Sequence, residues 1–182
     1  MDIICIMAKS CTGKSTVINE IFNRFKKETY IVKSYSTRLI RENDPNDINT
    51  HIFVDDLFFN KHKDKVFSIY KDKINNYKNW TDETSFKKEK CNLYAIDPKA
   101  FKEMVINNKD INTIGIYLDI NESERLLRHK LRGDEINFSA EDHLSFYHIN
   151  DMKNVFKINV DKKTPSEVAD EIISIAKKYN FL

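Results

Sequence analysis

One short segment near the N-terminus constrains the fold of this chain more than any other. Residues 2–7 form an apolar run, Asp2-Ile3-Ile4-Cys5-Ile6-Met7, which is typical of a buried β-strand. A polar loop follows at residues 8–16, and residues 14–27 carry the one-sided apolar spacing of a helix. Because the loop contains Gly13-Lys14-Ser15, this order of strand, loop and helix predicts a P-loop, a turn that holds phosphate groups.

Apolar runs and helical runs alternate along much of the remaining chain. Residues 34–90 are polar and less regular, and we expect them to form a small inserted subdomain. The alternation elsewhere predicts an α/β fold with a mostly parallel sheet covered by helices on both faces. The expected strands cover residues 30–32, 93–96, 113–118 and 156–160, and the expected helices cover residues 98–105, 121–132, 140–152 and the stretch after the Thr164 capping box.

The predicted P-loop gives each residue of the turn a role. Its backbone N–H groups would face phosphate oxygens, the Lys14 ammonium would reach the β- and γ-phosphates of ATP, and the Ser15 hydroxyl would bind Mg²⁺. Ala8 stands where the motif usually has glycine, so the loop keeps its shape only if Ala8 has ordinary dihedral angles. A chance Gly-Lys-Ser at a strand–helix turn is the alternative. The expected nucleotide-binding residues are Ser10, Cys11, Thr12, Gly13, Lys14, Ser15 and Thr16.

A second motif lies downstream of the expected helix. Residues 34–41 read Ser-Tyr-Ser-Thr-Arg-Leu-Ile-Arg and match the pattern S-x-[ST]-T-R-x-x-R. With this motif the chain resembles guanylate kinases over most of its length. The resemblance implies that Ser34, Arg38 and Arg41 hold the phosphate of an acceptor nucleotide, a role that suits planar, permanently charged guanidiniums. By residue type alone, the segment also fits a solvated basic turn.

The resemblance extends to residues on the ATP side. Residues 127–135 are similar to the start of the family's lid, which implies that Arg128 and Arg132 close over the ATP phosphates. Their four-residue spacing places both on one helix face, as it also would in an ordinary basic helix end. Asn159 matches a family asparagine near the adenine. Asp97 matches an acidic residue near nucleotide and metal, and a helix cap is its alternative role.

Several positions depart from the family pattern. His51 stands where the family has a phosphate-binding tyrosine, and it can still donate a hydrogen bond, more strongly when protonated. His143 stands where a second lid arginine is usual. Around the expected base site only Tyr77 and Thr81 match, and the guanine-reading glutamate has no counterpart, although Glu83 is a candidate nearby. Because a carboxylate pairs two guanine donors, the base of the acceptor stays open at this point.

Composition and charge fit a protein that binds small molecules. The 182 residues suit one domain, and a hydrophobic content of 41% is enough for a core. With 30 basic and 28 acidic residues the net charge is only +2, so we expect small-molecule nucleotides and no nucleic acid as partners. The chain has no long apolar run that predicts a membrane span and no signal-peptide pattern. Its three cysteines lack metal or disulfide spacing, which favours a cytoplasmic protein.

The sequence as a whole predicts a three-layer P-loop kinase that transfers the γ-phosphate of ATP to a nucleoside monophosphate, with GMP or dGMP as the first choice. Two alternatives remain: a P-loop kinase for another acceptor, and a guanylate-kinase-like nucleotide- or peptide-binding module without turnover. The expected catalytic residues are Lys14, Arg38, Arg128 and Arg132. The expected core comprises residues 1–33, 91–125 and 153–182, the acceptor-binding insert residues 34–90, and a short helical lid residues 126–152.

Overall fold

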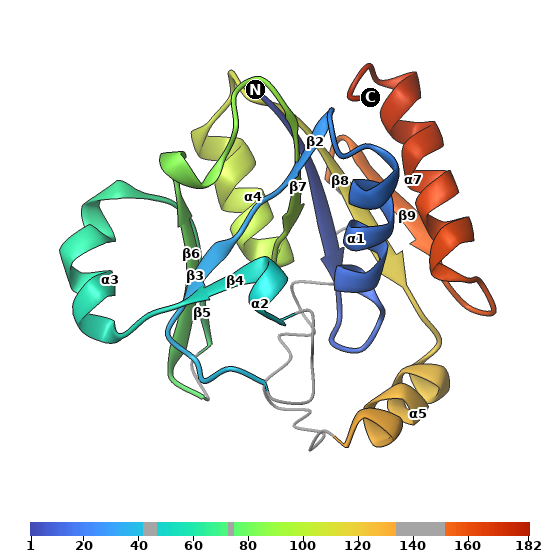
Figure 1. Cartoon of the computed structure of the whole chain (residues 1–182), viewed down its shortest axis with the longest axis horizontal. Coiled ribbons are helices and arrows are strands. Elements are labelled where there is room, and N and C mark those ends of the chain that lie inside the picture. Colours follow the sequence, from blue (N-terminus) through green and yellow to red (C-terminus); the bar gives the residue numbers. More distant parts are fainter. Residues whose placement is uncertain (42–46, 73–74, 134–151) are drawn as a thin grey trace.

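A five-stranded parallel sheet forms the centre of the computed structural model, which describes residues 1–41, 47–72, 75–133 and 152–182 (Figure 1). The strands lie in the order β2-β7-β1-β8-β9, and each neighbouring pair is parallel. The predicted α/β fold is therefore confirmed, with the first strand in the middle of the sheet. The strands are β1 (Asp2–Ala8), β2 (Thr29–Ile31), β7 (Cys91–Ala95), β8 (Asn112–Asp119) and β9 (Val155–Asn159).

Helices cover both faces of this sheet, because β1 presents apolar side chains to both faces. On one face, Ile4 and Ile6 pack with buried residues of α1 (Lys14–Arg24) and α7 (Pro165–Lys178). On the other face, Ile3 and Cys5 pack with buried residues of α4 (Pro98–Asn107). Successive side chains of a strand point to opposite faces, so a strand covered on both sides has to be apolar throughout. Each such side chain contributes about 1.5–3 kcal/mol on burial.

Residues 34–90 contain a second sheet, whose strands the sequence pattern did not predict. The four strands lie in the order β4-β3-β6-β5, with β3 parallel to β4 and antiparallel to β6. Polar and apolar side chains are mixed along β5 and β6, so no continuous apolar run marks these strands in the sequence. The elements are β3 (Ser34–Ser36), α2 (Asp47–Thr50), β4 (His51–Phe53), α3 (Asp56–His62), η1 (Lys63–Lys65), β5 (Val66–Asp72), β6 (Tyr77–Asp82) and η2 (Glu83–Ser85).

The predicted helix starts and stops are largely confirmed. The side chains of Asp97, Asn121 and Thr164 accept backbone N–H groups at the starts of α4, α5 (Glu122–Arg132) and α7, respectively. Gly133 ends α5 with a φ of 74°, a left-handed conformation that glycine adopts without strain. The capping role that was the alternative for Asp97 is thus confirmed, although its side chain also borders the cavity described below.

The first helix ends earlier than its sequence pattern indicates. It stops at Arg24, not at residue 27, because both the backbone N–H and the hydroxyl of Thr29 donate to the carbonyl oxygen of Phe25 and turn the chain into β2. The predicted helix at residues 140–152 falls almost wholly outside the described residues, as does His143. Among helices within the described ranges, none is both long and apolar enough to cross a membrane.

Candidate functional site

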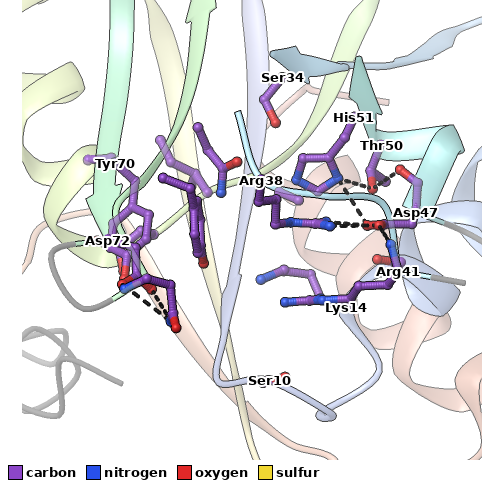
Figure 2. A pocket seen from close by; sticks show the side chains of 18 of the residues that line it. Ser10, Lys14, Ser34, Arg38, Arg41, Asp47, Thr50, His51, Tyr70 and Asp72 are labelled. Atoms are coloured by element: carbon purple, nitrogen blue, oxygen red, sulfur yellow. Dashed lines mark hydrogen bonds and ion pairs between the residues drawn. The ribbon is translucent and has the colours of Figure 1, made fainter. Parts of the chain in front are cut away.

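A cavity of about 780 Å³ lies between the P-loop segment and the second sheet, at the carboxyl ends of β1 and β7 (Figure 2). The carboxyl ends of parallel strands are the usual ligand position in α/β folds. Five Lys or Arg residues and three Asp residues are among those that line it, an excess of positive charge that favours anions. The predicted site residues in its lining are Ser10, Lys14, Ser15, Ser34, Arg38, Arg41, His51, Tyr77, Asp97 and Arg132.

The loop between β1 and α1 has the backbone that the P-loop prediction requires. Ala8 is the last residue of β1 and has extended backbone angles, so the glycine that usually stands there is not needed. Gly13 adopts a φ of 101°, which is open to glycine and strained for other residues. Cys11 has a φ of 61°, a left-handed conformation that costs a non-glycine residue on the order of 1 kcal/mol. The loop therefore forms its turn with a strained backbone at one non-glycine residue, Cys11.

Lys14 is a half-buried cation at the start of α1. Its Nζ donates to the carbonyl oxygen of Ala8 at 3.4 Å, a long bond that leaves most of its donor capacity for a ligand. Burial lowers the pKa of Lys14, Asp97 counteracts this, and the positive charge of Arg41 lowers it further. An anion bound beside Lys14 and Arg41 would relieve this repulsion, so the pair favours a phosphate.

Two arginines of α5 reach across to the same loop. Arg128 Nη1 donates to the carbonyl oxygen of Thr12 at 3.3 Å, and Arg132 Nη2 donates to Ser10 Oγ at 3.4 Å. Arg128 is also held by an ion pair with Glu124 at 3.1 Å. The four-residue spacing therefore places both guanidiniums on the side of the helix that faces the P-loop, as the sequence predicts.

The segment after β3 places a second group of cations beside Lys14. Arg38 forms a forked ion pair with the buried carboxylate of Asp47, and its side chain is only 9% exposed. Arg41 lies on the same wall of the cavity, close to Lys14 in Figure 2. Ser34, in β3, is buried and pairs in register with His51 of β4. These residues, distant from the P-loop in sequence, thus face the same cavity.

His51 is uncharged in this environment. Burial lowers its pKa, Arg38 and Lys14 lower it further, and Asp47 offsets only part of the effect, so that the pKa falls to about 4. Its Nδ1 lies 3.0 Å from Thr50 Oγ1 and 3.5 Å from Asp47 Oδ1. At neutral pH the neutral imidazole therefore contributes a hydrogen bond and not a charge, until an anion enters the cavity.

The second sheet turns a polar row toward the cavity. On β5 the alternate residues Ser68, Tyr70 and Asp72 line it, and on β6 Tyr77 and Asn79 do so, with Tyr70 beside Asn79 in register. Burial and then the Asp72 carboxylate raise the pKa of Tyr77 to about 12, so its phenol stays a hydrogen-bond donor. An aromatic cluster, which includes Tyr35, Phe58 and Trp80, packs on the other side of the sheet.

Some predicted site residues lie elsewhere among the described residues. Thr81 is fully buried and does not line the cavity; its hydroxyl lies 3.3 Å from the Tyr94 hydroxyl, which does. Thr16 is exposed on α1. Four further predicted residues do not line the cavity: the loop residues Cys11, Thr12 and Gly13, and Arg128, which contacts the loop. Asn159 is exposed at the end of β9, with its amide bonded to Asp161. Glu83 begins η2 and is exposed.

Three residues of the site were not predicted from the sequence. Asp47 and Asp72 are buried acids, the first paired with Arg38 and the second bonded by the backbone N–H of Asn75, and Asn79 is an amide in a polar strand. The Oδ1 atom of Asn79 is buried and has no hydrogen-bond partner among the described residues. A buried acceptor without a partner inside a cavity is costly, and a ligand that donates to it would remove the cost.

Ser15 offers a hard oxygen ligand for a magnesium ion at the loop. Ser15 lines the cavity beside Lys14, and a hydroxyl oxygen suits Mg²⁺, which keeps several waters and binds phosphate oxygens. Within the described ranges no group of three or more His, Cys, Asp or Glu side chains would hold a metal by itself. The residues present therefore fit a magnesium ion that enters with a nucleotide.

Comparisons with known proteins agree with this architecture at the level of the fold. No family model and no curated protein matches the sequence. Among solved structures, the chain is similar to the guanylate kinase from Anaplasma phagocytophilum, with a TM-score of 0.67 and 16% identity over 97% of this chain and 85% of that one. It is also similar to the tunicamycin resistance protein of Deinococcus radiodurans, with a TM-score of 0.54 and 10% identity over 96% and 95%. The chain has the α/β fold of a P-loop kinase.

Proposed function

We propose that this chain transfers the γ-phosphate of ATP to a nucleoside monophosphate, with GMP or dGMP as the leading acceptor. One observation carries the proposal: the P-loop lysine Lys14 shares a cavity with Arg38 and Arg41. A P-loop alone binds one phosphate chain, whereas a second cationic group beside it suits the phosphate of a second nucleotide. The fold that the chain shares with the Anaplasma guanylate kinase supports the same function.

The proposed reaction needs positioning and charge neutralisation more than covalent chemistry. A phosphate oxygen of the acceptor attacks the γ-phosphorus of ATP, and ADP leaves. Lys14 and the loop backbone bind the β- and γ-phosphates, and Arg128 and Arg132 offset the charge that develops between the two nucleotides. The Ser15 hydroxyl would hold a magnesium ion, which would supply further charge neutralisation.

The acceptor phosphate would lie on the opposite side of the cavity from the P-loop backbone. Arg38 and Arg41 supply charge, and Ser34, His51 and Tyr77 supply hydrogen-bond donors around them. Because the Tyr77 pKa is raised, its phenol keeps its proton at neutral pH, and because the His51 pKa is lowered, its imidazole is uncharged. The cluster therefore suits an acceptor that already carries a phosphate.

The polar row of the second sheet is the proposed base-reading wall. Ser68 Oγ accepts from the Tyr94 hydroxyl at 3.3 Å, so the Ser68 hydrogen is left to donate into the cavity. Asn79 Oδ1 and the Asp72 carboxylate supply acceptors along the same wall. Guanine presents a carbonyl oxygen beside N–H donors on one edge, and a wall that offers both donors and acceptors can pair with both kinds of group. The wall thus supports guanine as the base without the glutamate that the family uses.

The chain divides in this proposal into three parts. The core, residues 1–33, 91–125 and 153–182, holds the P-loop, and Asn159 would lie near the adenine of ATP. The insert, residues 34–90, binds the acceptor, and Asp97 borders the cavity between the two. The lid, residues 126–152, begins in α5, whose arginines contact the loop.

The test is ADP release by the purified protein with ATP and Mg²⁺ against a panel of ribo- and deoxynucleoside monophosphates, with free nucleosides as controls. We expect activity with monophosphates, highest with GMP or dGMP. A maximum with another monophosphate would keep the kinase and change the acceptor. Activity on nucleosides alone would contradict the acceptor-phosphate site, and nucleotide binding without ADP release would favour a non-catalytic binding module.

A further inference from the structure

A buried carboxylate, Asp47, lies among the cations on the acceptor side of the cavity. Its side chain is only 3% exposed, and the proposed reaction gives it no part in phosphate transfer. An ionised carboxylate is costly inside a protein unless its oxygens are fully paired. A carboxylate would also repel a phosphate placed against it. The role of Asp47 must therefore be sought in the groups that it holds.

The first of these groups is the Arg38 guanidinium. Arg38 Nη1 donates to Asp47 Oδ2 at 2.7 Å, and Nη2 donates to Oδ1. Nη1 also donates to the carbonyl oxygen of Leu39 at 2.9 Å, so that three of the five guanidinium N–H groups are used. Because a planar group held at two points cannot rotate, the remaining N–H groups have a fixed direction in the cavity wall.

The same carboxylate holds two further members of the cluster. Oδ2 accepts the backbone N–H of Arg41 at 2.9 Å, and Oδ1 lies 3.5 Å from Nδ1 of His51. Asp47, at the start of α2, thus joins the basic segment after β3 to the first residue of β4 (Figure 2). Burial alone would raise the pKa of Asp47, but the bonds from Arg38 and Arg41 outweigh it and lower the pKa, so the carboxylate is ionised at neutral pH.

We propose that Asp47 is the positioning residue of the acceptor-phosphate site, which orients its three partners so that they converge on one phosphate group. The inference rests on the proposed function for the identity of that phosphate. Without Asp47 the guanidinium of Arg38 would keep its bond to the Leu39 carbonyl but lose its two-point fixation, the Arg41 N–H would lose its acceptor, and His51 would lose a contact of 3.5 Å to the carboxylate. The P-loop would be less affected, because the carboxylate of Asp47 contacts the segment after β3 and the first residue of β4.

The experiment compares steady-state kinetics of wild type and Asp47→Asn with the monophosphate that wild type uses best. We expect KM for the monophosphate to rise roughly ten- to hundredfold, because three hydrogen bonds to charged groups are weakened, while KM for ATP is unchanged. Asp82→Asn is the matched control: Asp82 is a buried carboxylate, 8% exposed, that caps η2 and does not line the cavity. This control should leave both KM values at the wild-type level.

A second variant keeps the proposal testable if Asp47→Asn does not fold. Asp47→Glu retains the charge but displaces it, and we expect it to fold and to raise KM for the monophosphate by a smaller factor. A folded variant with unchanged KM for the monophosphate, or with both KM values raised equally, would overturn the positioning role. A lower Tm alone, with wild-type KM values, would also overturn it by reducing Asp47 to a structural residue.

The failure of the proposed function would be visible separately. If wild type released no ADP with any acceptor, the kinase proposal would fail, and calorimetric binding of GMP and of inorganic phosphate would then test Asp47. Weaker binding of both by the folded Asp47→Asn variant would support the positioning role. Equal binding by variant and wild type would contradict it.

Discussion

Arg128 of α5 donates from Nη1 to the carbonyl oxygen of Thr12 in the P-loop, across 3.3 Å. Arg132, on the same face of α5, reaches Ser10 of that loop. A Cβ atom added at Gly13 would lie 3.9 Å from Arg128 Nη1, so the two elements are in van der Waals reach. Helix α5 is therefore in contact with the loop that precedes α1, and in the proposed function both cations would lie near the ATP phosphates.

This contact predicts a catalytic role for the two arginines. Arg128→Ala or Arg132→Ala should lower kcat by roughly tenfold to a hundredfold, because each guanidinium stabilises charge that develops in the transition state. KM for the acceptor should stay near the wild-type value. Arg24→Ala is the control, since Arg24 pairs with Glu20 and Asp170 at the surface between α1 and α7. Wild-type kcat in both α5 variants would contradict the role.

His51 predicts a loss of stability in mild acid. Burial, followed by Arg38, lowers its pKa from 6.5 to about 4. Between pH 6.5 and pH 4 the unfolded chain binds a proton at His51 that the folded chain does not bind. The contribution of His51 to the free energy of unfolding is therefore complete above pH 6.5 and is lost as the pH falls toward 4. The loss reaches up to about 3 kcal/mol. His51→Gln should flatten this dependence in urea unfolding at a series of pH values, and parallel curves for the two proteins would contradict it.

The same side chain should respond to an anion in the cavity. A dianionic phosphate near His51 favours the charged imidazolium, so binding should raise the His51 pKa above its value in the free protein. NMR titration of the imidazole signals, with and without inorganic phosphate, measures this change. A pKa that stays at the free-protein value under saturating phosphate would place the anion away from His51.

The close packing around Gly115 in the central sheet leaves no room for a larger side chain. A Cβ atom at this position of β8 would lie 2.8 Å from Met7 Cε, 2.9 Å from Phe101 Cζ and 2.9 Å from Val155 Cγ2. Gly115→Ala should therefore lower the free energy of unfolding by about 1–3 kcal/mol through overpacking, with kcat of the folded variant unchanged. Urea unfolding measures the loss, and a change within about 0.5 kcal/mol would show that the neighbours move aside without cost.

Local patterns predicted the parts of the fold that depend on neighbouring residues. The strand, loop and helix around Lys14 and the caps at Asn121 and Thr164 are set by residues a few positions apart, and the structure has them where expected. The strands of the second sheet were not predicted, because Ser68, Asn79 and their neighbours put polar groups on its cavity face. The sequence therefore has no continuous apolar run at these strands.

Long-range partners explain what the sequence could not supply at the site. Asp47 lies nine positions from Arg38, and nothing in that spacing indicates a forked ion pair in a buried wall. Asp72 follows a short apolar run, and only the pairing of β5 with β6 turns it toward the cavity. Thr81 was placed in the base site by resemblance, whereas it is fully buried and does not line the cavity, with its hydroxyl 3.3 Å from that of Tyr94.

Transfer of phosphate from ATP to GMP, followed by ³¹P NMR with Mg²⁺ present, is the most direct measurement. Wild type should produce ADP and GDP, and Lys14→Ala should lower turnover by at least about a hundredfold, because the ammonium stabilises the transferring phosphate. Lys157→Ala is the control, since Lys157 is a half-exposed surface lysine paired with Asp119. Turnover unaffected by Lys14→Ala, or no diphosphate formed by wild type from any nucleoside monophosphate, would contradict the assignment.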